Sequence, residues 1–295
     1  MISTPPLHRR SIALPHVADS NMQLLEAGPS DAPALLFLHG WPESARAWEA
    51  VMRLAAGDGY HALAVDLPGI GGSAMRDAPA DKLGMATLLR EATNGLNLPG
   101  LTLVGHDVGG QVAFAWATAF PDDMARVVIM DVAVPGIEPW DDVLRNPHIW
   151  HFAFHAILKL PELLVGGKQR PYFDYFYDAI SGRPDAIPAD RRNAYADAYA
   201  GSEALGTGFG WYRAFPEDAK RNAGWVESKR RIGVPLLFLR GEHEGGEMEA
   251  YRRGFVDAGF ARVEGGIVPG AGHFAPEEAP EAVWKRIAAF IAANP

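Results

Sequence analysis

An aspartate in a glycine-rich turn is the residue of this sequence whose setting most clearly implies chemistry. Asp107 lies within Gly-His-Asp-Val-Gly-Gly at residues 105–110, after the apolar run 101–104 and before the helix-like run 111–116. A strand, a sharp turn and a helix in this order are typical of a nucleophile elbow, where serine is the usual nucleophile. A carboxylate instead attacks a strained or activated sp3 carbon and forms an alkyl-enzyme ester. The simpler alternative is an aspartate that only caps the following helix.

A histidine further along the chain could supply the base that such an ester requires. His273 lies in the loop Pro-Gly-Ala-Gly-His-Phe at residues 269–274, downstream of Asp107. A neutral imidazole can take a proton from water, and that water can then cleave the ester. Two acids could orient the imidazole, because Asp131 and Glu244 each follow an apolar run. The residues alone leave this choice open.

A third turn could supply hydrogen-bond donors for an oxyanion. The segment His-Gly-Trp-Pro at residues 39–42 follows the apolar run 34–38. We expect the backbone N–H groups of Trp41 and Val108 to form an oxyanion hole. The peptide bond between Trp41 and Pro42 is a candidate for the cis form, since X-Pro bonds are where cis peptides occur.

The elements that must position these groups are predicted from the pattern of apolar residues. Short apolar runs alternate with helical patterns at residues 34–38, 62–65, 101–104, 127–130 and 235–239. Such runs predict a parallel sheet that is covered on both faces. Segments around 12–17 and 22–26 are candidates for an antiparallel hairpin at the edge of the sheet.

The alternation of strands and helices stops between about residues 135 and 225. This stretch is rich in aromatic residues and contains no clear strand, so it is predicted to be a helical insertion. Most of its aromatic side chains are expected to pack between helices. A cap at the carboxyl edge of a sheet would also form the roof of an active site.

Composition excludes several classes of site and partner. The chain of 295 residues carries a net charge of −9 and has no cysteine, which argues against nucleic acid as a partner and excludes thiolate metal sites. His243 and Glu247 lie near Glu244, but they lack the His-Glu-x-x-His spacing of a metal site. No apolar run is long enough for a membrane span. We therefore expect a cytoplasmic protein that holds no metal.

Taken together, the motifs resemble those of epoxide hydrolases that have the α/β-hydrolase fold. The likeness rests on the turn at 39–42, the segment Gly-Ile-Gly-Gly-Ser at 69–73 and the turn at 105–110, and it spans nearly the whole chain. His273 matches the catalytic base of that family.

This resemblance also implies an architecture. It predicts an α/β fold with a mostly parallel central sheet of about eight strands flanked by helices, and a helical cap inserted after the sixth strand. The core would comprise residues 1–134 and 226–295, and the cap residues 135–225.

Within the family, the chain is most similar to the Cif-like branch. The segments Trp-His-Phe at 150–152 and Tyr-Arg-Ala at 212–214 match that branch, as does the acidic residue that ends the sixth strand ahead of a proline-containing segment, residues 130–135. In that branch a histidine and a tyrosine hold the epoxide oxygen, which implies this role for His151 and Tyr212.

The same resemblance bears on the orienting acid. In the Cif-like branch this acid follows the sixth strand, which favours Asp131. The chain departs from the branch by keeping Glu244, so Glu244 stands as the alternative.

Related dehalogenases also use an aspartate nucleophile. Haloalkane dehalogenases usually place tryptophan after the nucleophile and asparagine in the preceding turn, where this chain has Val108 and Trp41. Fluoroacetate dehalogenases place arginines just after the nucleophile, and residues 108–111 offer none. Epoxide opening is therefore preferred over dehalogenation.

We accordingly expect hydrolysis of a small hydrophobic epoxide to a vicinal diol, without an organic cofactor or a metal. No nucleic-acid or membrane partner is expected, and a homodimer is left open. Two further functions stay open beside this one: that of a dehalogenase, and that of a catalytically weak protein that keeps the fold to bind a small ligand.

Overall fold

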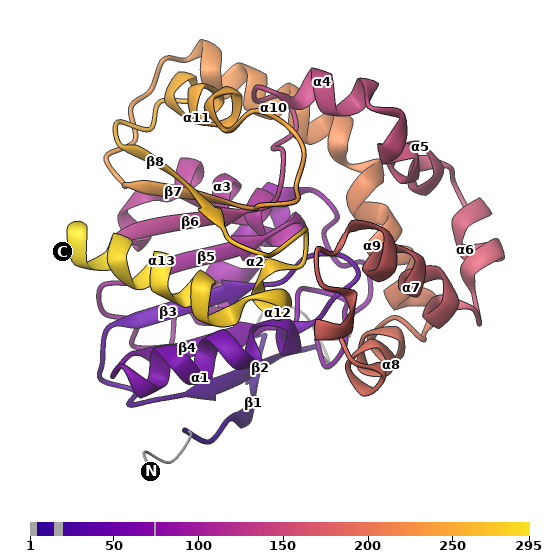
Figure 1. Ribbon diagram of the computed structural model, residues 1–295, viewed down its shortest axis with the longest axis horizontal. Helices are drawn as coiled ribbons and strands as arrows, with labels where there is room; N and C mark the ends of the chain where they lie inside the picture. Colours follow the sequence, from indigo (N-terminus) through magenta and orange to yellow (C-terminus); the bar gives the residue numbers. More distant parts are fainter. Residues whose placement is uncertain (1–4, 15–19, 74) are drawn as a thin grey trace.

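The protein is built around one eight-stranded sheet, as the computed structural model of residues 5–14, 20–73 and 75–295 shows (Figure 1). The strand order is β1-β2-β4-β3-β5-β6-β7-β8, with β1 and β2 antiparallel to their neighbours and the rest parallel. The strands are β1 (His8–Ala13), β2 (Asn21–Ala27), β3 (Ala34–Leu38), β4 (His61–Val65), β5 (Thr102–His106), β6 (Arg126–Met130), β7 (Leu236–Gly241) and β8 (Val263–Val268). The predicted α/β architecture is confirmed.

The five predicted internal strands are found close to their predicted positions. Every residue of β3, β4, β5 and β6 is buried, because both faces of the sheet are covered. This explains why these strands contain continuous apolar runs rather than an alternating pattern. The edge hairpin is also present, as β1 and β2, although the part of the prediction at residues 15–17 lies outside the described residues.

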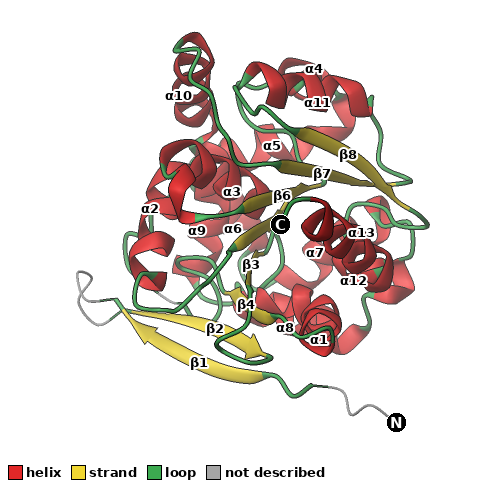
Figure 2. Ribbon diagram, turned by 90° about the vertical axis from the view of Figure 1, so that its left-hand side faces the viewer, coloured by secondary structure: helices red, strands yellow, loops and turns green. Residues whose placement is uncertain are grey.

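Helices cover the two faces of the sheet in a consistent pattern (Figure 2). One face carries α1 (Glu49–Gly57) and α13 (Pro280–Ala293), which contact each other, with the short α12 (Ala275–Glu278) beside them. The other face carries α2 (Lys82–Thr93) and α3 (Val108–Ala119), and the ring of Phe255 in α11 (Met248–Asp257) packs near Phe114 of α3.

The segment between β6 and β7 is helical, as predicted. It contains α4 (Trp140–Arg145), α5 (Trp150–Ala156), α6 (Leu160–Val165), α7 (Gln169–Ile180), α8 (Ala189–Ala198), α9 (Ser202–Arg213) and α10 (Phe215–Glu227). In Figure 1, α5 to α9 lie together on one side of the sheet. The helix α10 crosses the predicted boundary at residue 225, and the division of the chain into two domains stays a prediction.

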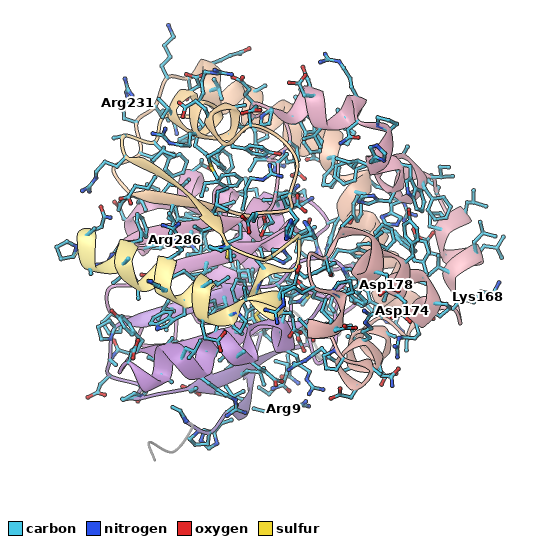
Figure 3. All side chains as sticks on the ribbon, in the orientation of Figure 1. Arg9, Lys168, Asp174, Asp178, Arg231 and Arg286 are labelled. Atoms are coloured by element: carbon cyan, nitrogen blue, oxygen red, sulfur yellow. The ribbon has the colours of Figure 1, made fainter. Side chains whose placement is uncertain are left out.

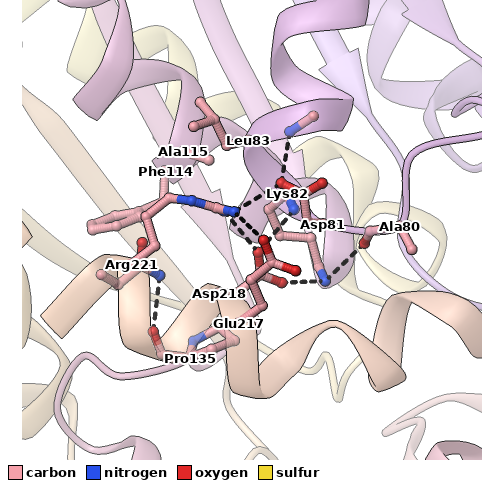
Figure 4. A network of polar contacts seen from close by, with 12 residues as sticks. Ala80, Asp81, Lys82, Leu83, Phe114, Ala115, Pro135, Glu217, Asp218 and Arg221 are labelled. Carbon is pink, nitrogen blue, oxygen red and sulfur yellow. Dashed lines mark hydrogen bonds and ion pairs between the residues drawn. The ribbon is translucent and has the colours of Figure 1, made fainter. Parts of the chain in front are cut away.

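A buried ion pair fastens this helical segment to the core (Figure 4). The ammonium of Lys82 at the start of α2 lies 2.8 Å from Asp218 on α10, and the backbone N–H of Lys82 donates to the same carboxylate. Arg221 adds a second contact with Asp218 at 3.1 Å. Because Lys82 and Asp218 are almost fully buried, each charge depends on the other for compensation.

Many other charged side chains lie at the periphery of the molecule. Arg9, Lys168, Arg231 and Arg286 are exposed examples, labelled in Figure 3. None of the helices in the described ranges combines the length and the apolar composition that crossing a membrane would require.

Candidate active site

The candidate site is a cavity of about 690 Å³ between the carboxyl ends of the strands and the helical segment. All the side chains predicted for catalysis line it: Asp107, Asp131, His151, Tyr212, Glu244 and His273. They come from the ends of β5, β6, β7 and β8 and from α5 and α9. Parallel strands end at one edge of the sheet, which explains how residues so far apart in sequence meet.

The nucleophile elbow has the strained backbone that its sequence implies. Asp107 has φ of 48° and ψ of −124°, directly between β5 and α3. The sharp turn brings Gly105 so close to α3 that a Cβ atom there would lie 2.2 Å from the carbonyl oxygen of Gly109. Conformations of this kind cost a non-glycine residue about 1–3 kcal/mol and are found mostly at functional sites. The turn therefore presents the Asp107 carboxylate to the cavity at an energetic cost.

The turn after β3 contacts one oxygen of this carboxylate. The backbone N–H of Trp41 donates to Oδ1 of Asp107 at 2.8 Å. Close approach is allowed by Gly40, whose position leaves no space for a side chain: a Cβ there would lie 2.5 Å from Cβ of Asp107. The peptide bond between Trp41 and Pro42 is cis, as predicted. Val108 begins α3, so its N–H belongs to the first helical turn, where amides have no partner within the helix.

His273 contacts the other oxygen of the nucleophile and a second carboxylate. Its Nε2 lies 3.9 Å from Oδ2 of Asp107, and its Nδ1 lies 3.4 Å from Oε1 of Glu244. Glu244 is held in turn by Arg240, at 3.0 Å. The two ring nitrogens thus face the nucleophile on one side and an orienting acid on the other.

The charges around His273 stabilise its protonated form. Burial lowers the pKa of His273, but the hydrogen bond and charge of Glu244, followed by the charge of Asp107, raise this pKa to about 10. The pKa of Glu244 is lowered overall. Burial raises this pKa, but the contacts with His273, followed by the charge of Arg240, outweigh the effect of burial. Glu244 is therefore ionised at neutral pH.

Asp131 uses its carboxylate differently, which bears on the choice between the two acids. Its Oδ1 accepts a hydrogen bond from the backbone N–H of Gly241 at 2.7 Å, and its buried Oδ2 has no hydrogen-bond partner among the described residues. Burial, and then the charge of Glu244, raise the pKa of Asp131 to about 7. The resemblance favours Asp131 as the orienting acid, whereas the observed contact with His273 is made by Glu244 and so favours the alternative.

Tyr212 and His151 face the same cavity from α9 and α5. Their ring centroids are 5.9 Å apart, and the ring of Trp41 lies 5.8 Å from that of Tyr212. Burial, and then the charge of Asp107, raise the pKa of Tyr212 well above its usual value, so its phenol stays protonated. Burial lowers the pKa of His151 to about 3, with His273 adding to the effect, so its imidazole is neutral near pH 7. Both side chains can therefore donate one hydrogen bond.

Sequence reasoning missed a buried pair directly behind the nucleophile. His106, the residue before Asp107, contacts Glu43 at 2.9 Å, and neither side chain has any exposed surface. The available signal was the position of His106 within the turn at 105–110 and of Glu43 directly after the turn at 39–42.

Comparisons with known proteins find similarity to α/β-hydrolase-fold proteins and to epoxide hydrolases. Residues 33–167 match the family model described as alpha/beta hydrolase fold. The soluble epoxide hydrolase of Corynebacterium sp. (strain C12) is 28% identical over 260 residues, which cover 84% of this chain and 86% of that protein.

Two solved structures extend the likeness to the whole fold. The epoxide hydrolase CorEH superimposes with a TM-score of 0.85 at 26% identity, covering 98% of this chain and 99% of that one. The Cif epoxide hydrolase from Acinetobacter nosocomialis gives a TM-score of 0.82, covering 96% of this chain and 88% of that one. Its sequence identity is 20%, so that comparison shows the shared fold alone.

Proposed function

We propose that this chain, an α/β-hydrolase-fold protein of the epoxide hydrolase family, hydrolyses an epoxide to a vicinal diol through an ester on Asp107. The observation that carries the proposal is that the two oxygens of the Asp107 carboxylate make different contacts. Oδ1 accepts the Trp41 N–H at 2.8 Å, and Oδ2 faces His273, which contacts Glu244. A carboxylate held in this way can act as a nucleophile first and as the acyl group of an ester afterwards.

In the first step, Oδ2 of Asp107 attacks a ring carbon of the epoxide. The carbon–oxygen bond of the ring breaks, and the electron pair goes to the epoxide oxygen. Tyr212, with His151 beside it, donates a proton to that oxygen as charge develops. Both groups carry a proton to donate at neutral pH, and a donor aimed at developing charge lowers the barrier.

Formation of the ester changes the charge next to His273. Asp107 loses its negative charge, so one of the interactions that raises the pKa of His273 disappears. The imidazole then gives up its proton more easily, and this proton replaces the one that the donor pair transferred. His273 becomes the neutral base that the second step needs.

In the second step, His273 takes a proton from water, and the water oxygen adds to the carbonyl carbon of the ester. The negative charge that develops on Oδ1 is met by the N–H of Trp41, with that of Val108 as the second donor. Collapse of the tetrahedral intermediate releases the diol and returns a carboxylate that contains one oxygen from water. Glu244 stabilises the imidazolium formed in this step, and we propose it rather than Asp131 as the orienting acid.

The ester can be trapped and identified directly. His273→Gln should leave alkylation intact and prevent water activation, so intact-protein mass spectrometry should show the mass of the epoxide added. The double variant with Asp107→Asn is the matched control and should show no adduct. In the wild-type enzyme, turnover of epoxide in 18O-labelled water should first place label in the Asp107 carboxylate, and a single turnover in unlabelled water should then transfer this label to the diol. Label that arrives only from fresh solvent would exclude the covalent route.

The two competing functions give different results in the same assays. A dehalogenase would release halide from haloalkanes or haloacetates faster than it forms diol from any epoxide. A binding protein would show saturable binding across an epoxide panel without turnover or adduct.

A further inference from the structure

The pair formed by His106 and Glu43 lies beneath the site and takes no direct part in the two proposed reaction steps. Nδ1 of His106 lies 2.9 Å from Oε2 of Glu43, and Nε2 lies 2.7 Å from the backbone carbonyl oxygen of His273. The imidazole of His106 is fully buried, and its ring centroid is 5.1 Å from that of His273. A residue adjacent to the nucleophile thus touches the main chain of the catalytic base.

The partners of His106 determine its protonation. A carboxylate at neutral pH and a carbonyl oxygen both only accept hydrogen bonds, so each ring nitrogen of His106 must carry a proton. His39, a second buried histidine nearby, provides the contrast. Its Nε2 accepts from the backbone N–H of Leu67 at 2.9 Å, so its other nitrogen carries the proton and donates to the carbonyl of Gly40. These two buried histidines therefore differ in charge. His39 is neutral because one of its partners donates a hydrogen bond, whereas His106 is charged because both of its partners accept.

The surrounding charges agree with this assignment. Burial lowers the pKa of His106, but the charge and hydrogen bond of Glu43 raise it above its usual value overall. Burial raises the pKa of Glu43, but the charge and hydrogen bond of His106, followed by the effects of His39 and Gly40, lower this pKa below its usual value overall. For His39, burial dominates and lowers the pKa.

We propose that His106 is a positioning residue, a buried imidazolium paired with Glu43 that fixes the backbone of His273 relative to the turn carrying Asp107. This inference rests on the proposed function, because it assigns His106 a role in the second step. The imidazole of His273 must point at the ester carbonyl of Asp107, yet His273 lies in a loop between Gly272 and Phe274 rather than in a helix or strand.

Two hydrogen bonds from opposite sides hold the main chain of His273. The carbonyl accepts from His106 in the core, and the N–H donates to the carbonyl of Ile180 on α7 at 2.9 Å. Glu278 anchors the neighbours by accepting from the N–H groups of Gly272 and Phe274 at 2.9 Å each. Of these contacts, only the one from His106 connects the base to the nucleophile elbow.

Two substitutions separate the contacts of His106. His106→Asn keeps a donor near the Nδ1 position, toward Glu43, and removes the contact with His273. His106→Gln keeps a donor near the Nε2 position, toward His273, and removes the contact with Glu43. Neither variant carries the charge.

The expected result is a split between the two steps. In His106→Asn, the rate of ester hydrolysis should fall about 10- to 100-fold while the rate of ester formation changes less than about threefold, because misplacement of about 1 Å costs rates of this order. His106→Gln should retain a hydrolysis rate closer to that of the wild type. Equal losses in both steps, or no loss of hydrolysis in His106→Asn, would overturn the positioning role.

A matched control shows what the loss of any buried histidine–glutamate pair does. His61 is also buried and contacts Glu26 at 2.7 Å, but it lies on β4, away from the cavity. His61→Asn should lower stability without changing the ratio of the two rates.

A measurement without catalysis tests the charge itself. In 15N-histidine NMR spectra of the wild-type protein near pH 8, His106 should show protons on both ring nitrogens, and His39 on Nδ1 alone. A neutral His106 would overturn the proposal even if no variant folds. Failure of His273→Gln to form any ester would instead reject the proposed function, and the NMR result would stand apart from it.

Discussion

At the scale of single residues, two carboxylates, Glu244 and Asp131, are candidates for the acid that orients the imidazole of His273. Glu244 contacts Nδ1 of His273, whereas Asp131 accepts from a backbone amide. Burial, and then the charge of Glu244, raise the pKa of Asp131 to about 7. Only Glu244 is placed to stabilise an imidazolium directly. The two roles can be separated by removing one charge at a time.

We predict that Glu244→Gln slows ester hydrolysis by at least about 100-fold, because the imidazolium formed in that step loses its charge partner. Asp131→Asn should slow it less than about tenfold, since the amide oxygen can still accept from Gly241. Single-turnover measurement of ester decay in both variants decides between them. A larger effect of Asp131→Asn would restore Asp131 as the orienting acid.

The role of Tyr212 is tested by removing one oxygen atom. Tyr212→Phe keeps the ring packed against Trp41 and His155, with centroids 5.8 Å and 4.4 Å away, and deletes only the donor. Ester formation should slow about tenfold to a thousandfold, because a donor to developing charge is worth on the order of 3 kcal/mol. Rapid-quench measurement of adduct formation gives this rate, and thermal unfolding gives the control for stability. An unchanged rate would remove Tyr212 from the mechanism.

At the scale of helices and strands, the sequence predicted the buried elements better than the exposed ones. The strand β3 was predicted at its observed bounds, because a buried parallel strand is a continuous apolar run. The edge strand β1 begins earlier than predicted, and five of its six residues are exposed. Its sequence carries little apolar signal, so pairing with β2 decides its position.

The choice of the acid could not be made from sequence for a related reason. The strands β6 and β7 are neighbours in the sheet, so the residues that follow them arrive at the same place. Which carboxylate reaches His273 depends on the loop after each strand. The charge on His106 was equally hidden, because it depends on a carbonyl 167 positions away in the chain.

The contact between α2 and α10 is predicted to be a main support of the helical segment. In Asp218→Asn, the ammonium of Lys82 would remain buried without an ionised partner, which costs about 3–5 kcal/mol when a buried pair is broken. Chemical denaturation should show this loss of stability. Glu217, the exposed neighbour of Asp218, provides the control: Glu217→Gln should change the free energy of unfolding by less than about 0.5 kcal/mol. Equal effects of the two substitutions would contradict the assignment.

At the scale of the whole molecule, we expect the protonation of His273 to make the free energy of unfolding depend on pH. The pKa of His273 is raised from 6.5 to about 10, so the folded protein binds this proton more tightly than the unfolded chain does. The resulting stability is fully present below about pH 6.5 and is lost as the pH rises through about 10. The difference in free energy of unfolding between the wild type and His273→Gln should therefore shrink between about pH 7 and pH 10. A constant difference over this range would show that His273 is not charged in the resting protein.

The main chain of His273 is bonded to the elbow side through His106 and to the helical segment through Ile180. Displacement of α7 from the core would break the second of these bonds. The main-chain position of His273 thus depends on the packing of the helical segment against the core as well as on the loop that carries this residue.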